Sequence, residues 1–173
     1  MLEFLYYVQE EIMTYIHRET FEIVEKLLQP KDNCLIIDDT IVPSIQVLNR
    51  KGYRTNECCS GHPFKGRKNC YIVFDKGVLL PSPPLDFTIK HRYITINDKR
   101  ILIDCSIKNA IQIKTNELEK MLEEKAELHK EIEFIIERRW KADIDFYAFL
   151  RENVQALEQL YKWALDLPDF KGE

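Results

Sequence analysis

The distribution of glycine and proline constrains the fold of this chain more than any other feature of its sequence. All but three of these residues fall between Pro43 and Pro84, the exceptions being Pro30, Pro168 and Gly172. Because both residue types interrupt helices, loops and turns should concentrate in the middle of the chain, and both ends are free to form helices. The 173 residues are enough for one folded domain with a hydrophobic core.

The N-terminal segment Leu2–Leu28 carries apolar side chains at intervals typical of one helical face. They are Leu5, Val8, Ile12, Tyr15, Ile16, Ile23, Val24 and Leu27. Pro30 follows and would end a helix. We therefore predict an N-terminal helix in residues 1–31, the first of three segments.

The middle segment, residues 32–114, should be an α/β core. Short apolar runs predict strands at Cys34–Ile37, Tyr53–Cys59, Cys70–Phe74, Tyr93–Ile96 and Ile101–Cys105. The amphipathic stretch Ile41–Lys51 predicts one short helix, for which Asp38-Asp39-Thr40 offers an N-cap. The polar residues between the last two runs are typical of a hairpin, which favours a small, mostly antiparallel sheet.

The last segment, residues 115–173, lacks glycine and proline from Asn116 to Leu167. Its apolar residues follow two heptad series that are out of phase, with a break near Arg139–Asp143. The series are Leu118, Met121, Leu128, Ile132 and Ile135, then Trp140, Tyr147, Val154 and Tyr161. They predict an antiparallel helical hairpin, or alternatively one long bent helix used for dimerisation. The predicted fold class is α+β.

Composition narrows the function classes. The net charge of −4 provides no global basic field for bulk nucleic acid. No apolar run approaches the roughly 20 residues that span a bilayer, and the N-terminus lacks the basic start of a signal peptide, so we expect a cytoplasmic protein. The five cysteines are an odd number, and in a reducing compartment they are better read as free thiols or metal ligands than as disulfides.

The segment Thr55–His62 (TNECCSGH) concentrates two thiols, a hydroxyl and an imidazole around a glycine. The stretch from Arg50 to Cys70 also holds six basic residues and only one acid, Glu57. A short turn of this kind can direct its N–H groups toward one anion. The candidate ligand-binding residues are Thr55, Cys58, Cys59, Ser60, Gly61 and His62, together with Arg54, Lys65 and Arg67.

Two further chemistries compete with anion binding. Zinc could be held by Cys58, Cys59, His62 and Cys70, although adjacent cysteines in a strand point to opposite faces. Alternatively, Cys59 could act as a catalytic nucleophile with His62 as its base, provided that the fold brings up a third residue such as Asp38 or Asp104. Against all three, the segment could be a solvated loop whose cysteines simply pack in the core.

The run from Leu48-Asn-Arg-Lys-Gly-Tyr through Cys58-Cys-Ser-Gly-His to Tyr71-Ile-Val-Phe resembles an uncharacterised family of proteins from Gram-positive bacteria and their phages. That family shares a LNxKGYxTxxCCSGH…YIxF core, and the resemblance covers about Asp39–Phe87. A fainter similarity links Cys58–Gly61 to the Ser-Cys-Ser-Gly stretch of the wybutosine-synthesis methyltransferase family, in which an arginine stands at the place of His62. The second resemblance implies tRNA methyl transfer as a remote alternative.

The sequence thus favours a small-ligand binding protein that grips an anionic, nucleotide-like molecule at the CCSGH loop. The phage resemblance implies a role in bacterial defence or counter-defence, for instance by sequestering a signalling nucleotide. The alternatives are a cysteine- and histidine-dependent enzyme, and a protein-interaction module that forms a homodimer through its C-terminal helices.

Overall fold

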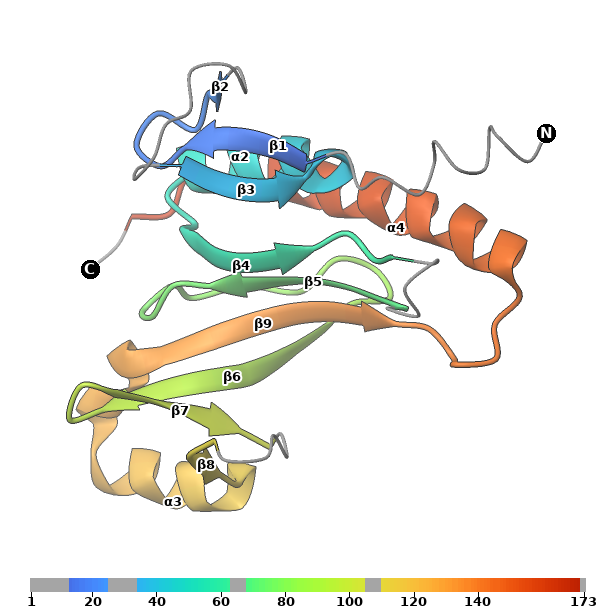
Figure 1. Ribbon diagram of the computed structural model, residues 1–173. Coiled ribbons are helices and arrows are strands. Elements are labelled where there is room, and N and C mark those ends of the chain that lie inside the picture. Colours follow the sequence, from blue (N-terminus) through green and yellow to red (C-terminus); the bar gives the residue numbers. More distant parts are fainter. Residues whose placement is uncertain (1–12, 25–33, 63–67, 105–109, 172–173) are drawn as a thin grey trace.

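The computed structural model of the protein describes residues 13–24, 34–62, 68–104 and 110–171. Its architecture is α+β, with a three-stranded and a six-stranded sheet (Figure 1). Within these residues the helices are α2 (Val42–Arg50), α3 (Thr115–Glu124) and α4 (Phe146–Asp166), with short 3-10 turns at Asp39–Ile41 and Ala126–Glu131. None of the helices in the described part of the chain is long and apolar enough to span a membrane.

The smaller sheet contains β1 (Met13–His17), β2 (Ile23–Val24) and β3 (Cys34–Asp38), in the antiparallel order β2-β1-β3. The predicted N-terminal helix is therefore wrong over residues 13–24, and the rest of its range lies outside the described residues. Ile16 pairs with Ile23 and is fully buried. Because β-branched and aromatic side chains fit a half-buried pleated surface, this pairing outweighs the helical spacing.

The larger sheet has the order β4-β5-β9-β6-β7-β8, and all its neighbours are antiparallel except β7 and β8. Its strands are β4 (Thr55–Cys59), β5 (Asn69–Phe74), β6 (Thr88–Ile96), β7 (Lys99–Ile103), β8 (Gln112–Ile113) and β9 (Ile132–Arg139). The five strands predicted from the middle of the sequence are confirmed with shifted ends. The sheet is nevertheless larger than expected, because β9 lies between β5 and β6.

Strand β9 replaces one limb of the predicted helical hairpin, and that prediction is not confirmed. Ile132 and Ile136 are fully buried, whereas Glu133 and Glu137 alternate with them on the opposite face. This two-residue alternation is the pattern of a strand. The heptad interpretation failed because Ile132 and Ile135 also match a helical spacing.

The helices pack on one face of the larger sheet. Ile136 belongs to a core cluster with Ala156 and Leu160 of α4, and Ile132 to a second cluster with Leu118 of α3. Since Ile132 and Ile136 share one face of β9, both helices cover that face, and no helix among the described residues covers the other.

Helix α4 follows the predicted break and begins after Asp145, whose carboxylate accepts a hydrogen bond from the Ala148 N–H. The helix cap therefore lies two residues beyond the predicted break at Arg139–Asp143. The buried face of α4 consists of Phe149, Asn153, Ala156, Leu160 and Ala164. The heptad residues Tyr147, Val154 and Tyr161 are exposed.

Candidate functional site

The CCSGH segment lies where two neighbouring strands end. Figure 1 shows β3 and β4 side by side and pointing in the same direction, with α2 connecting them through the layer behind. Asp38 is the last residue of β3 and Cys59 the last residue of β4. Two side chains that are distant in sequence therefore meet at one edge of the fold.

Ser60 ties the two strand ends together. Its N–H and its hydroxyl both donate to Asp38 Oδ2, over 2.8 and 3.1 Å. Asp38 makes no side-chain hydrogen bond as a helix cap, which was its predicted role. The Ser60 N–H, which the sequence analysis directed at a bound anion, is thus occupied by an anion of the protein itself.

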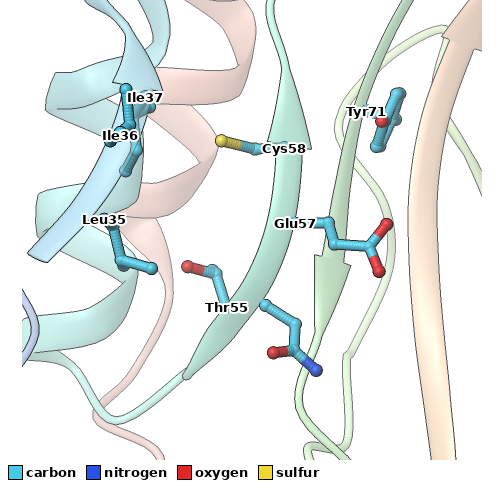
Figure 2. A pocket seen from close by; sticks show the side chains of 8 residues that line it. Leu35, Ile36, Ile37, Thr55, Glu57, Cys58 and Tyr71 are labelled. Carbon is cyan, nitrogen blue, oxygen red and sulfur yellow. The ribbon is translucent and has the colours of Figure 1, made fainter. Parts of the chain in front are cut away.

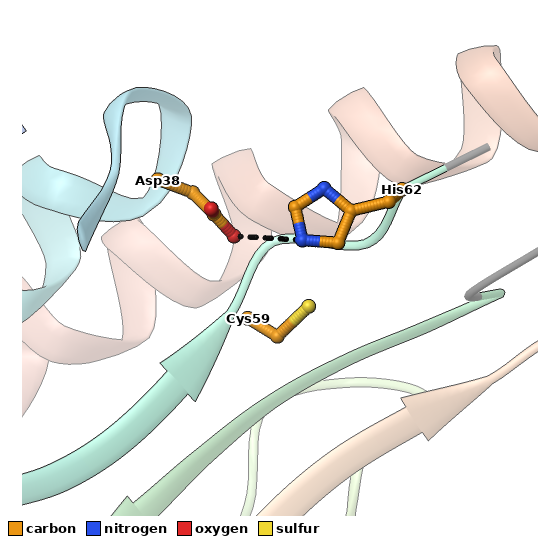
Figure 3. A group of neighbouring side chains, drawn as sticks. All are labelled: Asp38, Cys59 and His62. Atoms are coloured by element: carbon orange, nitrogen blue, oxygen red, sulfur yellow. Dashed lines mark ion pairs between the residues drawn. The ribbon is translucent and has the colours of Figure 1, made fainter. Parts of the chain in front are cut away.

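Asp38, Cys59 and His62 form a compact cluster (Figure 3). His62 Nε2 lies 3.4 Å from Asp38 Oδ2, and one donor atom from each of the three residues lies within 4.8 Å of the other two. All three are shielded from solvent: Cys59 is 4% exposed, and the side chains of His62 and Asp38 are 12% and 11% exposed.

Helix α4 holds the segment from behind. The Asn153 side-chain amide donates to the Ser60 carbonyl over 2.7 Å. Gly61 has a φ of +95°, and a Cβ at this position would lie only 3.0 Å from Asn153 Nδ2. The turn thus requires glycine, both for its backbone conformation and for the close approach of α4.

Cys58 faces away from this cluster. Figure 2 shows its sulfur directed toward β3, on the side opposite to Glu57. It lines a pocket of about 290 Å³ between β3 and β4, together with Leu35, Ile36, Ile37, Thr55, Asn56, Glu57 and Tyr71. Burial above all raises the pKa of the Cys58 thiol to about 12, and burial likewise raises the pKa of Cys70. Both thiols therefore stay protonated near neutral pH, which disfavours them as nucleophiles.

Cys59 borders a second pocket, of about 370 Å³, on the sheet face opposite to α3 and α4. The other lining residues are Asn69, Tyr71, Arg92, Ile135, Glu137 and Arg139. Glu137 is 4% exposed and is bound by Lys90 and by Arg139, each over 2.8 Å. Although burial acts to raise it, these two hydrogen bonds and charges hold the pKa of Glu137 below its usual value. The carboxylate is therefore compensated within the protein.

Arg92 lines the same pocket and lies at a β-bulge of β6, between His91 and Tyr93. Its Nε is buried and has no hydrogen-bond partner among the described residues. A buried donor without a partner is costly, so such groups commonly mark a place where a ligand or an ion belongs.

Two of the described cations near the loop, Lys51 and Lys68, make contacts elsewhere in the fold. Lys51 Nζ donates to the carbonyls of Leu165 and Leu167 at the end of α4, and Lys68 Nζ donates to those of Ala142 and Ile144. Lys65 and Arg67 lie outside the described residues, and Arg54 precedes β4 at the end opposite to Cys59.

Thr55, another predicted ligand-binding residue, is engaged by Asn49 of α2. Its hydroxyl accepts a hydrogen bond from Asn49 Nδ2 over 2.8 Å, and its N–H donates to Asn49 Oδ1. Of the predicted metal set, the fold brings Cys59 and His62 together and adds Asp38, while Cys58 and Cys70 lie outside the cluster.

Sequence reasoning missed Arg92, Arg139 and Glu137 as pocket residues. The available signal was the two-residue spacing of Glu137 and Arg139 at the end of β9, which the heptad interpretation obscured. Asp38 was expected as part of a helix N-cap or as a residue that could orient His62, and not as a metal ligand.

The arrangement of Asp38, Cys59 and His62 is that of three donor atoms around one point and not that of a catalytic triad. In a triad, the acid and the nucleophile contact different imidazole nitrogens. In Figure 3 the nitrogen that contacts Asp38 is also the one on the side of the Cys59 sulfur, and the second nitrogen points away from both.

Comparison with protein-family models, with curated proteins and with solved structures finds no match to this chain.

Proposed function

We propose that the protein binds a small anionic, nucleotide-like molecule in the Cys59–Arg92 pocket, the pocket lined by Cys59, Asn69, Tyr71, Arg92, Ile135, Glu137 and Arg139. The observation that carries this proposal is that Arg92, whose buried Nε has no hydrogen-bond partner among the described residues, lines a polar pocket. Guanidinium groups match phosphate and carboxylate oxygens in geometry and in charge.

The charges of the pocket also favour an anion. Glu137 is the acidic residue of its lining, and Lys90 and Arg139 already bind it. Lys90, Arg139 and Arg92 together carry three positive charges, and Glu137 carries one negative charge. An entering anion therefore meets an excess of positive charge. The pocket between β3 and β4 has the opposite character, since its described lining contains Glu57 and no lysine or arginine.

Size and shape support a ligand of about one nucleotide. The volume of about 370 Å³ is near the lower end of the range for small-molecule sites. Tyr71 offers an aromatic surface, and burial above all raises the pKa of its phenol, which therefore remains a neutral hydrogen-bond donor. Asn69 adds an amide that can pair with a base edge or a sugar hydroxyl.

The test is a binding titration with nucleoside mono- and diphosphates, cyclic nucleotides and inorganic phosphate, followed by calorimetry. We expect Arg92→Gln to weaken binding by at least about tenfold, because a hydrogen bond to a charged group contributes about 1.5–3 kcal/mol. Arg151→Gln, on the exposed side of α4, is the matched control and should bind normally. The proposal fails if no phosphorylated compound binds at millimolar concentration, or if both variants bind equally.

A second candidate function is self-association through α4. Tyr147 and Val154, which are spaced by one heptad, are 75% and 65% exposed, and Tyr161 continues the row. Exposed apolar rows of this kind are frequent at helix–helix contacts. Light scattering after size exclusion should show a dimer that Val154→Glu dissociates. A wild-type monomer at high protein concentration removes this candidate.

A further inference from the structure

We infer that Asp38, Cys59 and His62 form a binding site for a single zinc-like divalent cation. The inference goes beyond the anion proposed above and does not require it, since the only residue shared with the Cys59–Arg92 pocket is Cys59. It combines three observations: the convergence of the donor atoms, the chemistry of the donors, and the hydrogen bonds that hold the carboxylate.

The donor atoms already have nearly the separation that tetrahedral zinc requires. For nitrogen and oxygen ligands at about 2.0–2.1 Å from zinc, the two donor atoms lie about 3.3 Å apart. The observed distance from His62 Nε2 to Asp38 Oδ2 is 3.4 Å. The donor atoms of all three residues lie within 4.8 Å of one another, so a small movement of the Cys59 side chain would complete the geometry.

The donor set selects the class of metal. Calcium and magnesium prefer oxygen ligands alone, whereas a thiolate and an imidazole beside one carboxylate suit zinc. Cys59 is the thiol that fits this role, because its sulfur lies with the donor atoms of Asp38 and His62, whereas Cys58 points to the other side of β4.

Supporting hydrogen bonds fix the carboxylate as they do in established metal centres. Ser60 donates its N–H and its hydroxyl to Asp38 Oδ2, and Asn153 of α4 in turn donates to the Ser60 carbonyl. Outer partners of this kind orient the ligands of a metal and reduce the cost of assembling the site.

Three protein ligands leave one coordination position for water or for a bound molecule, which is the pattern of catalytic rather than structural zinc sites. Access is available from the sheet face, because Cys59 also lines the Cys59–Arg92 pocket. The metal would therefore lie next to the arginines that the proposed anion contacts.

The experiment uses the full chain, freed of metal with a chelator and then titrated with Zn²⁺ against a chromophoric zinc indicator. A parallel titration with Co²⁺ reports thiolate ligation through a sulfur-to-cobalt absorption band. We expect one equivalent of metal and a thiolate band. Cys59→Ser should abolish the band and weaken binding by at least about 100-fold, and Ser60→Ala should weaken binding by about 10–100-fold. Cys58→Ser, one residue away, is the matched control and should keep both the absorption band and the affinity for zinc.

Circular dichroism of each variant separates loss of metal from loss of fold, and His62→Gln is the second variant if Cys59→Ser does not fold. The inference is overturned if the wild-type protein binds no zinc at micromolar concentration, or if Cys58→Ser loses as much affinity as Cys59→Ser. Zinc binding without affinity for any phosphorylated compound would refute the proposed function and leave the metal site standing. The reverse result would refute only the metal site.

Discussion

Replacing Gly61 by alanine should destabilise the protein more than the same replacement at Gly77. Both glycines have positive φ, +95° at Gly61 and +80° at Gly77. At Gly77 the new Cβ would meet only the Lys130 carbonyl oxygen, at an ordinary 3.5 Å. At Gly61 it would lie 3.0 Å from Asn153 Nδ2 and 3.4 Å from Phe149 Cζ. The pair thus separates backbone strain from crowding against α4.

The magnitudes follow from these contacts. Positive φ costs an alanine about 1–2 kcal/mol, and the lower entropy of the unfolded chain returns about 0.4–1 kcal/mol. Gly77→Ala should therefore lower the free energy of unfolding by about 1 kcal/mol. Crowding in a well-packed site adds about 1–3 kcal/mol, so Gly61→Ala should lower it by about 2–4 kcal/mol.

Urea denaturation followed by circular dichroism measures both changes. At about 2–4 °C per kcal/mol for a chain of this length, Gly61→Ala should also lower the Tm by roughly 5–15 °C. Equal losses in the two variants would refute the close packing of α4 on the CCSGH segment. In that case the positioning of Cys59 and His62 by Asn153 would need another explanation.

Three further predictions concern the sheet and α4. Because the pKa of Glu137 is lowered in the folded protein, its contribution to stability is present above about pH 4.5 and is lost as the pH falls through the lowered pKa. The free energy of unfolding in urea should therefore change less between about pH 7 and about pH 4 in Glu137→Gln than in the wild-type protein, and equal changes would contradict this prediction. Arg100→Met removes the cationic partner of the buried Glu133, which among the described residues keeps only a hydrogen bond from Asn56, and should lower the free energy of unfolding by about 3 kcal/mol; an unchanged urea midpoint would contradict this prediction. Phe149→Ala empties a fully buried site beside Trp140 and should cost about 3–5 kcal/mol in the same assay, and a loss below about 1 kcal/mol would contradict the packing described here.

The middle of the fold could be predicted because its signals are local. Apolar runs bounded by turn residues predicted β3, β4, β5 and the β6–β7 hairpin, and amphipathic spacing predicted α2. Strand β9 was missed because its isoleucines satisfy two periodicities. The strand also depends on partners that are distant in sequence: β9 pairs with β5 and β6, and its buried Glu133 binds Arg100, which is 33 residues away.

The candidate site was predictable in part. The CCSGH segment identified Cys59 and His62, because thiol and imidazole side chains cluster there in sequence. Asp38 reaches them only because β3 and β4 run side by side, and Arg92 reaches the pocket only because β6 pairs with β9. Both depend on long-range pairing, which local patterns do not encode.

The central position of β9 sets an order for assembly during synthesis. Strands β5 and β6 each pair with β9 along one edge, and β9 is translated about sixty residues after β5. Until β9 leaves the ribosome, each of these strands has an unpaired edge, and such edges are prone to join other chains. A chain that stops before Ile132 should therefore aggregate, and the Cys59–Arg92 pocket can form only after most of the protein has been translated.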